Sequence, residues 1–195
     1  TAAQCDRAEA AMSRSIVFDI TERKKLEHRL EELSNSDAMT GLCNRRHFYE
    51  LASNEIARAN RLQSSFSLAI LDVDHFKRVN DEFGHAIGDE LLISLAQTLK
   101  AKMRSIDIVA RIGGEEFAIL MPHTDLTNAL TVMDRLREEL AESTIPLSDG
   151  RLVRFTVSIG VTAQQGNEFD IDAMLVRADK ALYTAKGSGR NRVCA

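Results

Sequence analysis

Apolar and polar residues alternate on both sides of a Gly-Gly pair near the middle of the chain. Before the pair the alternation runs from Ile106 to Ile112, and after it Phe117, Ile119 and Met121 continue it. A period of two is typical of strands with one buried face, and glycines tolerate the positive φ that tight turns require. The pattern predicts a β-hairpin over residues 107–121.

Glu115 and Glu116 are expected to lie exposed at the tip of this hairpin. The Gly-Gly pair before them would let a phosphate or a nucleotide approach the backbone without meeting a Cβ. Adjacent carboxylates repel each other, and a divalent cation nearby would relieve the repulsion. A solvated acidic turn explains the same two residues equally well, so the hairpin alone leaves both interpretations open.

Other stretches of the chain predict four core helices and two further strands. Apolar residues recur every three to four positions in residues 44–62, 91–103, 126–140 and 171–185, which predicts the helices. In the first of these helices, the stripe expected to face the core is Phe48, Leu51, Ile56, Ala59 and Leu62. A continuous apolar run over 66–73 predicts a buried central strand, and alternation over 153–161 predicts one long strand.

The order of these elements predicts the fold class. From Phe66 on, it contains a split β-α-β-β-α-β pattern, which is typical of an α/β (α+β) fold with a central, mostly antiparallel sheet flanked by helices. The crossover helix returns the chain beside its start, so the end of strand 66–73 and the hairpin can be neighbours. We therefore expect Asp72 and Glu115 to converge.

The N-terminal part is expected to be an extended helix outside this fold. Leu26, Leu30 and Leu33 recur at four and three residues in a charged stretch, as along a coiled-coil seam. So short and charged a helix over residues 21–36 is unstable alone, which favours pairing with a second copy of the chain; a frayed linker fits equally well. Further upstream, Ser15–Ile20 could form a short strand.

Composition narrows the class of protein. The 195 residues, 44% of them hydrophobic, suffice for one domain with an extension. A net charge of -4 and 5% aromatic residues argue against a protein that wraps nucleic acid. Three scattered cysteines show neither metal-ligand spacing nor a disulfide framework, which favours a reducing, cytoplasmic compartment. No apolar run approaches the roughly 18 residues of a membrane helix. Because the chain begins at Thr1, we expect a fragment, and membrane segments upstream stay open.

Residues 72–89 read as a loop dense in functional groups and poor in core residues. Asp72, together with Glu115 and Glu116, could supply the oxygen ligands that Mg²⁺ prefers, with positions left for phosphate oxygens. Lys77 could offset phosphate charge.

The same loop offers a pair of residues suited to guanine. Asp89 can accept from the guanine N1–H and the exocyclic amine together, and Asn80 can both donate and accept at a base edge. Asp81 and His85 fit helix caps or loop staples equally well. Each residue alone has such a structural explanation, but their joint placement with Gly-Gly-Glu-Glu favours a nucleotide site.

Five motifs in order resemble the GGDEF domain of diguanylate cyclases. They are Asp-Ala-Met-Thr-Gly-Leu-Cys-Asn-Arg-Arg (37–46), residues 72–89, Gly-Gly-Glu-Glu-Phe (113–117), Val-Ser-Ile-Gly-Val (157–161) and residues 178–191. The resemblance implies a palm-like fold related to nucleotidyl cyclases, and condensation of two GTP into cyclic di-GMP with release of pyrophosphate. Glu115 replaces the aspartate of the family signature and keeps its charge, and Met39 and Cys43 vary a motif that is mainly structural.

The resemblance also implies a division of the chain. Residues 37–195 would form the catalytic domain and residues 21–36 a signalling helix. Residues 1–20 would be the tail of an upstream sensor domain or disordered. Ile16 to Leu26 looks like the end of a PAS sensor that runs into such a helix.

For the metal site, the resemblance implies that Asp72 and Glu115 bind Mg²⁺ or Mn²⁺, with the Val73 carbonyl as a third ligand. It gives Glu116 the role of a metal contact or of the base near the 3′-hydroxyl.

For the substrate, the resemblance implies that Asn80 and Asp89 read guanine. The phosphates would be bound by Lys77, Lys186 and Arg190, aided by backbone amides near His75 and Phe76.

For regulation, Arg104 and Asp107 match the inhibitory product site of the family, and Arg135 lies where a second arginine of that site often falls. The implied partners are GTP, cyclic di-GMP as product and inhibitor, and a second copy of the chain through the N-terminal helix. Two rivals remain. One is an inactive GGDEF module that only binds GTP or cyclic di-GMP and signals through partners; the other is a polymerase palm, which the acidic balance disfavours.

Overall fold

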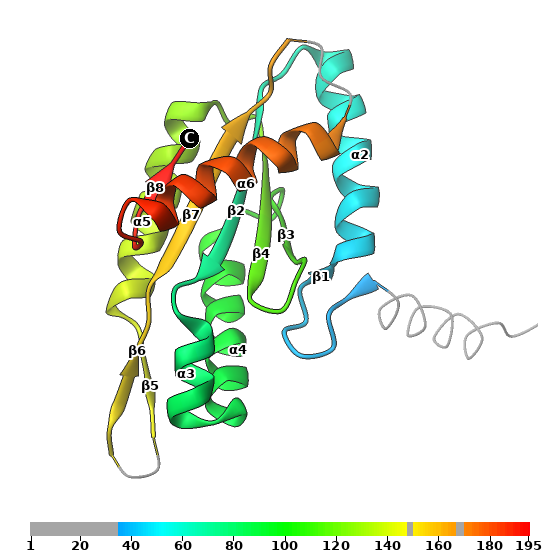
Figure 1. The fold of residues 1–195 in the computed structure, drawn as a ribbon. Helices are drawn as coiled ribbons and strands as arrows, with labels where there is room; N and C mark the ends of the chain where they lie inside the picture. The colour runs from blue at the N-terminus through cyan, green and yellow to red at the C-terminus, as the bar shows by residue number, and fades with distance from the viewer. Residues whose placement is uncertain (1–34, 148–149, 167–169) are drawn as a thin grey trace, which may run out of the picture.

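The computed structural model describes residues 35–147, 150–166 and 170–195, and within them a six-stranded sheet forms the centre (Figure 1). Its order is β1-β3-β4-β2-β7-β8. The strands are β1 (Cys43–Asn44), β2 (Phe66–Val73), β3 (Ile108–Arg111), β4 (Glu116–Pro122), β7 (Val157–Ala163) and β8 (Val193–Cys194). The four central strands are antiparallel to one another, whereas the edge strands β1 and β8 pair in parallel with β3 and β7. A separate hairpin of β5 (Thr144–Pro146) and β6 (Leu152–Arg154) extends away from the sheet.

Helices cover both faces of the sheet. They are α2 (Arg45–Leu62), α3 (Phe76–Phe83), α4 (His85–Lys102), α5 (Leu126–Glu142) and α6 (Ile171–Gly187). All of β2 is buried, and its side chains alternate between two apolar clusters. Leu71 packs in the cluster of α4 and α5, whereas Ile70 packs in the cluster of α2 and α6. The predicted hairpin, central strand and split β-α-β-β-α-β order are therefore confirmed. Among the described residues, no helix is both long and apolar enough to cross a membrane.

The prediction of one long strand over residues 153–161 is wrong. β6 ends at Arg154 and pairs with β5, and β7 begins at Val157 and pairs with β2. Between them, Phe155 is buried in the core, and the Thr156 carbonyl accepts a hydrogen bond from Asp74 N (2.9 Å). The chain leaves one sheet for the other at this point, and alternating hydrophobicity continues through the break.

Two helix predictions also need correction. Leu62 is 56% exposed and Leu51 only half-buried, whereas Ala52 faces the core together with Phe48 and Ile56, which fits a period of 3.6 residues. The predicted loop over residues 72–89 contains α3 and the first turn of α4. The leucine stripe of the predicted N-terminal helix and the strand expected before it lie outside the described residues; at the end of that stretch, Ser36 forms an antiparallel bridge with Cys43.

Candidate active site

Carboxylates from two neighbouring strands meet at one end of the sheet. The antiparallel register of β2 and β4 pairs Asp72 with Glu116, two positions beyond the pair of Ile70 and Ala118. Because side chains alternate along a strand, Asp72 and Glu116 share the sheet face of Ile70, which α2 and α6 cover. The charge of Asp72 also acts on Glu115, as the predicted convergence of these two residues requires.

The glutamates themselves are placed differently from the prediction. Glu115 and Glu116 are half-buried, not exposed, because the ladder with β2 continues as far as Glu116. Neither glycine of the turn has a positive φ. Gly113 leaves room for the Glu116 side chain instead, since a Cβ there would lie 2.5 Å from Glu116 Oε2 and the carboxylate would have to move. A Cβ on Gly114 would meet open space, which leaves the turn accessible to a ligand.

The carboxylates hold protons more tightly than usual. Burial raises the pKa of Asp72, and Asp74 adds to the rise, while the Lys186 ammonium, 2.8 Å from Asp72 Oδ1, and Arg190 oppose it. Burial also raises the pKa of Glu115, followed by repulsion from Asp72 and Glu116. The cluster is therefore short of positive charge even with Lys186 in contact.

The donor set fits a hard divalent cation only in part. Within the described residues, no three His, Cys, Asp or Glu side chains form a metal-binding group by themselves. Asp72 and Glu115 could hold Mg²⁺ together with the Val73 carbonyl, and the remaining positions would go to phosphate oxygens. A cationic group, Lys186 Nζ, already contacts Asp72, which supports a cation at this place.

An ion pair holds the signature hairpin, which consists of β3, the Gly113–Gly114 turn and β4. The Arg111 guanidinium donates to the Gly114 carbonyl (2.7 Å) and to Asp37 Oδ1 (3.2 Å). Burial would raise the pKa of Asp37, but hydrogen bonds from Thr40 and Arg111 outweigh it and hold this pKa below its usual value. Sequence reasoning missed this pair, because its members are 74 positions apart and no local pattern joins them.

The start of α3 offers a site for phosphate next to the carboxylates. His75 adopts a left-handed conformation (φ 58°) and makes no side-chain hydrogen bond to the helix. Arg78 N and Val79 N donate to His75 O, so the Phe76 and Lys77 amides are the ones left for an anion at the positive end of the helix dipole. Phe76 is buried and anchors this turn, while Lys77 is exposed beside it.

The predicted guanine pair lies across the junction of α3 and α4. Asn80 Oδ1 is buried and has no hydrogen-bond partner within the described structure. It packs against Gly88, where a Cβ would come within 1.9 Å of it. Asp89 follows Gly88 and is exposed. Buried polar atoms are nearly always paired, so the Asn80 oxygen is suited to a donor on a ligand.

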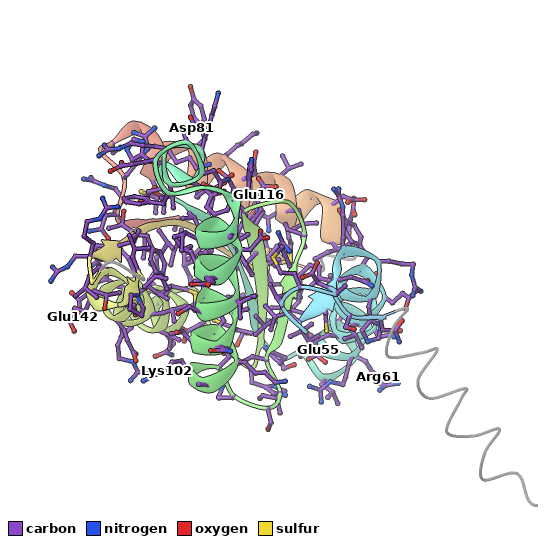
Figure 2. The ribbon with its side chains drawn as sticks, turned by 90° about the horizontal axis from the view of Figure 1, so that it is seen from below. Glu55, Arg61, Asp81, Lys102, Glu116 and Glu142 are labelled. Carbon is purple, nitrogen blue, oxygen red and sulfur yellow. The ribbon has the colours of Figure 1, made fainter. Side chains whose placement is uncertain are left out.

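The predicted product site lies elsewhere. Arg104 donates to Asp107 through its backbone N (2.8 Å) and Nη2 (2.8 Å), and Nη2 also reaches Thr124 Oγ1 (2.8 Å). The ion pair of Lys102 and Glu139 joins the end of α4 to α5, and Arg135 lies one turn before Glu139 on that helix. Arg135 is exposed. Figure 2 shows Lys102 on the opposite side of the molecule from Glu116 and the α3 residue Asp81.

Comparison with known proteins points in the same direction as this geometry. A model of the family described as "Diguanylate cyclase, GGDEF domain" matches residues 34–192. Diguanylate cyclase DgcM of Escherichia coli is 47% identical over 180 residues, which cover 92% of this chain and 43% of that protein. Response regulator PleD of Caulobacter vibrioides is 42% identical, over 88% of this chain and 38% of its own length. The chain thus spans less than half the length of these curated relatives.

Solved structures share the fold. The coiled coil and GGDEF domain of DgcB from Caulobacter crescentus, in complex with c-di-GMP, superposes with a TM-score of 0.83 at 31% identity and covers 89% of this chain and 93% of that one. The active GGEEF domain of a diguanylate cyclase from Vibrio cholerae gives a TM-score of 0.73 at 35% identity, over 78% of this chain and 96% of that one.

Proposed function

Because the chain belongs to the GGDEF-domain family of diguanylate cyclases, we propose that it condenses two GTP into cyclic di-GMP and releases two pyrophosphates. One observation carries the proposal. Asp72 and Glu116 face each other across β2 and β4, and the charge of Asp72 also acts on Glu115; Lys186 and the start of α3 lie beside them. Acidic ligands, a cationic side chain and helix amides converge there, as the transfer of a charged phosphoryl group requires.

In the proposed mechanism, each group acts on a different part of the substrate. Asp72, Glu115 and the Val73 carbonyl would hold Mg²⁺ or Mn²⁺, which stabilises charge on the α-phosphate. Glu116 stands beside this group and is the candidate to accept the proton of the attacking 3′-hydroxyl. Lys77 offsets phosphate charge from the start of α3.

In the same mechanism, Lys186, Arg190 and backbone amides bind the terminal phosphates of GTP. Lys186, which contacts Asp72, would bind the phosphates with a metal ion at the carboxylates, and Arg190 would add a guanidinium, since its charge acts on Asp72. The amides after His75 complete the anion site. The unpartnered Asn80 oxygen and the exposed Asp89 select guanine.

A second site binds the product. Asp107 holds the Arg104 guanidinium in a fixed orientation. Arg135 lies on α5, which the ion pair of Lys102 and Glu139 joins to the end of α4, next to Arg104 in the chain. Asp107 and Thr124 accept from Nε and Nη2 of the Arg104 guanidinium, which leaves its Nη1 to donate to a phosphate oxygen. The c-di-GMP complex of DgcB supports product binding by a domain of this type. Binding at Arg104, Asp107 and Arg135 would inhibit turnover.

Turnover tests the proposal directly. The chain is incubated with GTP and Mg²⁺, and cyclic di-GMP and pyrophosphate are quantified by mass spectrometry and a coupled assay. Asp72→Ala should abolish both products, since metal stabilisation is worth several kcal/mol. Asp81→Ala is the matched control, because Asp81 is an exposed acid on α3 and the proposal assigns it no contact with metal or substrate. Binding of GTP without any product would favour an inactive module, and absence of both would refute the proposal.

A further inference from the structure

The loop after α6 carries two consecutive left-handed residues that are not glycine. Arg190 has a φ of 63° and Asn191 a φ of 44°. For residues with a Cβ, such conformations are costly, and they persist only where surrounding contacts hold them. The loop runs from Ser188 to Arg192, between α6 and β8, and Arg190 lies four residues after Lys186, so the path of the loop decides where the Arg190 side chain lies.

Asp74 supplies the contact that holds this loop. Its Oδ2 accepts from Asn191 N (3.0 Å) and from Thr156 Oγ1 (2.7 Å), and its Oδ1 accepts from Ser158 Oγ (2.6 Å). The side chain is 5% exposed. Burying a carboxylate is unfavourable unless it is hydrogen-bonded, and three donors from two separate segments meet that requirement here.

Other contacts fix both ends of the loop, and in its middle Arg192 Nε donates to Arg190 O (3.0 Å), while the backbone amide of Asn191 is bound by Asp74. Arg190 N donates to Ala185 O (3.0 Å) at the end of α6, and Ile159 N donates to Arg192 O (2.9 Å) where β8 joins β7. Arg137 Nη1 reaches the Asn191 side chain (3.1 Å) from the solvent side. The Asn191 amide, between the two left-handed residues, is bound by Asp74.

We propose that Asp74 is a positioning residue for the substrate triphosphate. Its carboxylate is held by Ser158, the β7 partner of the proposed metal ligand Asp72. From there it fixes the backbone at Asn191 so that the Arg190 guanidinium faces the carboxylate end of the site. This inference rests on the proposed function for the role of Arg190 but assigns Asp74 no contact with metal or substrate.

Kinetics of Asp74 and Arg190 variants test the proposal. Asp74→Ala and Arg190→Ala should each raise the KM for GTP by about tenfold or more, with a smaller change in kcat, because a charged contact to the terminal phosphates is present in the ground state as well. The double variant should be no worse than the poorer single variant, since both changes remove one interaction. Asp74→Asn should restore most of the KM, because its amide oxygen still accepts from Asn191 N while its NH₂ group donates to Ser158 Oγ.

Opposite results overturn the proposal. A parental KM in Asp74→Ala, or additive effects in the double variant, would show that Asp74 does not act through Arg190. Where Asp74→Ala fails to fold by circular dichroism, Thr156→Val replaces it in the same cycle, since it removes one donor and keeps the carboxylate; additivity with Arg190→Ala is again the adverse result.

Calorimetric binding separates this inference from the proposed function. If the parent binds GTP but forms no cyclic di-GMP, the cyclase proposal fails, while weaker GTP binding by Asp74→Ala and Arg190→Ala with unchanged guanosine binding still supports the positioning role. If cyclic di-GMP forms but the two residues act independently on GTP binding, only the positioning role fails.

Discussion

At the scale of single residues, the raised pKa values of Asp72 and Glu115 link metal binding to pH. Both lie above their ordinary values of 3.8 and 4.5 in the metal-free protein. The protonated forms are thus favoured by folding, so their contribution to stability is complete below those values and is lost as pH rises through the raised pKa values. Mg²⁺ needs the deprotonated forms and must compete with protons over the same window.

We therefore expect the shift in melting temperature caused by Mg²⁺ to grow as pH rises through this window, while the metal-free protein becomes less stable. Thermal unfolding with and without Mg²⁺ across pH 4 to 8 (about the range concerned) measures both trends. In the double variant Asp72→Asn, Glu115→Gln both trends should flatten. A Mg²⁺ shift that is independent of pH, or unchanged in that variant, would contradict the assignment.

Gly88 allows the second prediction at this scale. In Gly88→Ala the new Cβ would come within 1.9 Å of Asn80 Oδ1, so the flexible Asn80 side chain must turn away from the guanine position. Folding should survive, the KM for GTP should rise by about tenfold or more, and the preference for GTP over ATP should fall. Gly187→Ala is the matched control, because a Cβ there meets no atom within 4 Å. Competition assays with ATP decide; equal behaviour of the two variants would remove Asn80 from base recognition.

How far the sequence predicts these residues depends on the distance between partners. Asp72 and Glu115 could be brought together from the order of strands, because each lies at a recognisable strand end. Asp74 could not be assigned, since its donors are 82, 84 and 117 positions away and form no local pattern. The role of Gly113 was also missed, because its lack of a Cβ serves the neighbouring Glu116 carboxylate and not the φ of the turn.

At the scale of elements, Arg111 connects the signature hairpin to the start of the domain. Its fork binds Gly114 O and Asp37 together, which a lysine cannot reproduce. In Arg111→Lys we expect kcat to fall on the order of ten- to hundredfold, because small misplacement of reacting groups has effects of this size. Arg46→Lys is the control, since Arg46 and its partner Glu50 are 54% and 51% exposed. Equal kcat in both variants would show that the hairpin does not need this clamp.

The next prediction concerns inhibition by the product at the junction of α4, β4 and α5. Arg104→Ala should raise the concentration of cyclic di-GMP needed for half-inhibition by about tenfold or more, because bonds from a charged donor to phosphate are lost. Arg61→Ala, an exposed arginine on α2, should leave inhibition unchanged. Inhibition curves at fixed GTP measure the effect. A parent chain without product inhibition, or equal inhibition of both variants, would rule the site out.

Elements in which apolar residues recur with a single clear period were predictable. Elements at points where the chain changes direction were not. β2 was recognised from its apolar run, and α5 from its stripe. β6 and β7 merged into one prediction, because the alternation of apolar residues continues through the point where the strands separate. α3 escaped notice since it has eight residues, and only Phe76 and Val79 of them are buried, which is too short a stripe to reveal a period.

At the scale of the whole molecule, one domain holds half of the proposed reaction. The product has two equivalent phosphodiester links, each made when the 3′-hydroxyl of one nucleotide attacks the α-phosphate of the other. The described residues bring together one group of Asp72, Glu115 and Glu116 and one proposed guanine pair. The proposed reaction therefore requires two copies that face each other, and pairing of identical surfaces about a two-fold axis is the commonest way to achieve that.

The last prediction follows from this need for two chains. The leucine stripe at Leu26, Leu30 and Leu33, which lies outside the described residues, is the proposed pairing device, because a helix pair raises the local concentration of the domains it joins. Three leucines give modest affinity, so specific activity should rise with protein concentration. Leu30→Asp should lower it at dilute protein, and Lys25→Asp, off the stripe, should lower it less. Turnover measured beside sedimentation tests this: constant specific activity down to concentrations that contain only monomer would refute a two-chain mechanism.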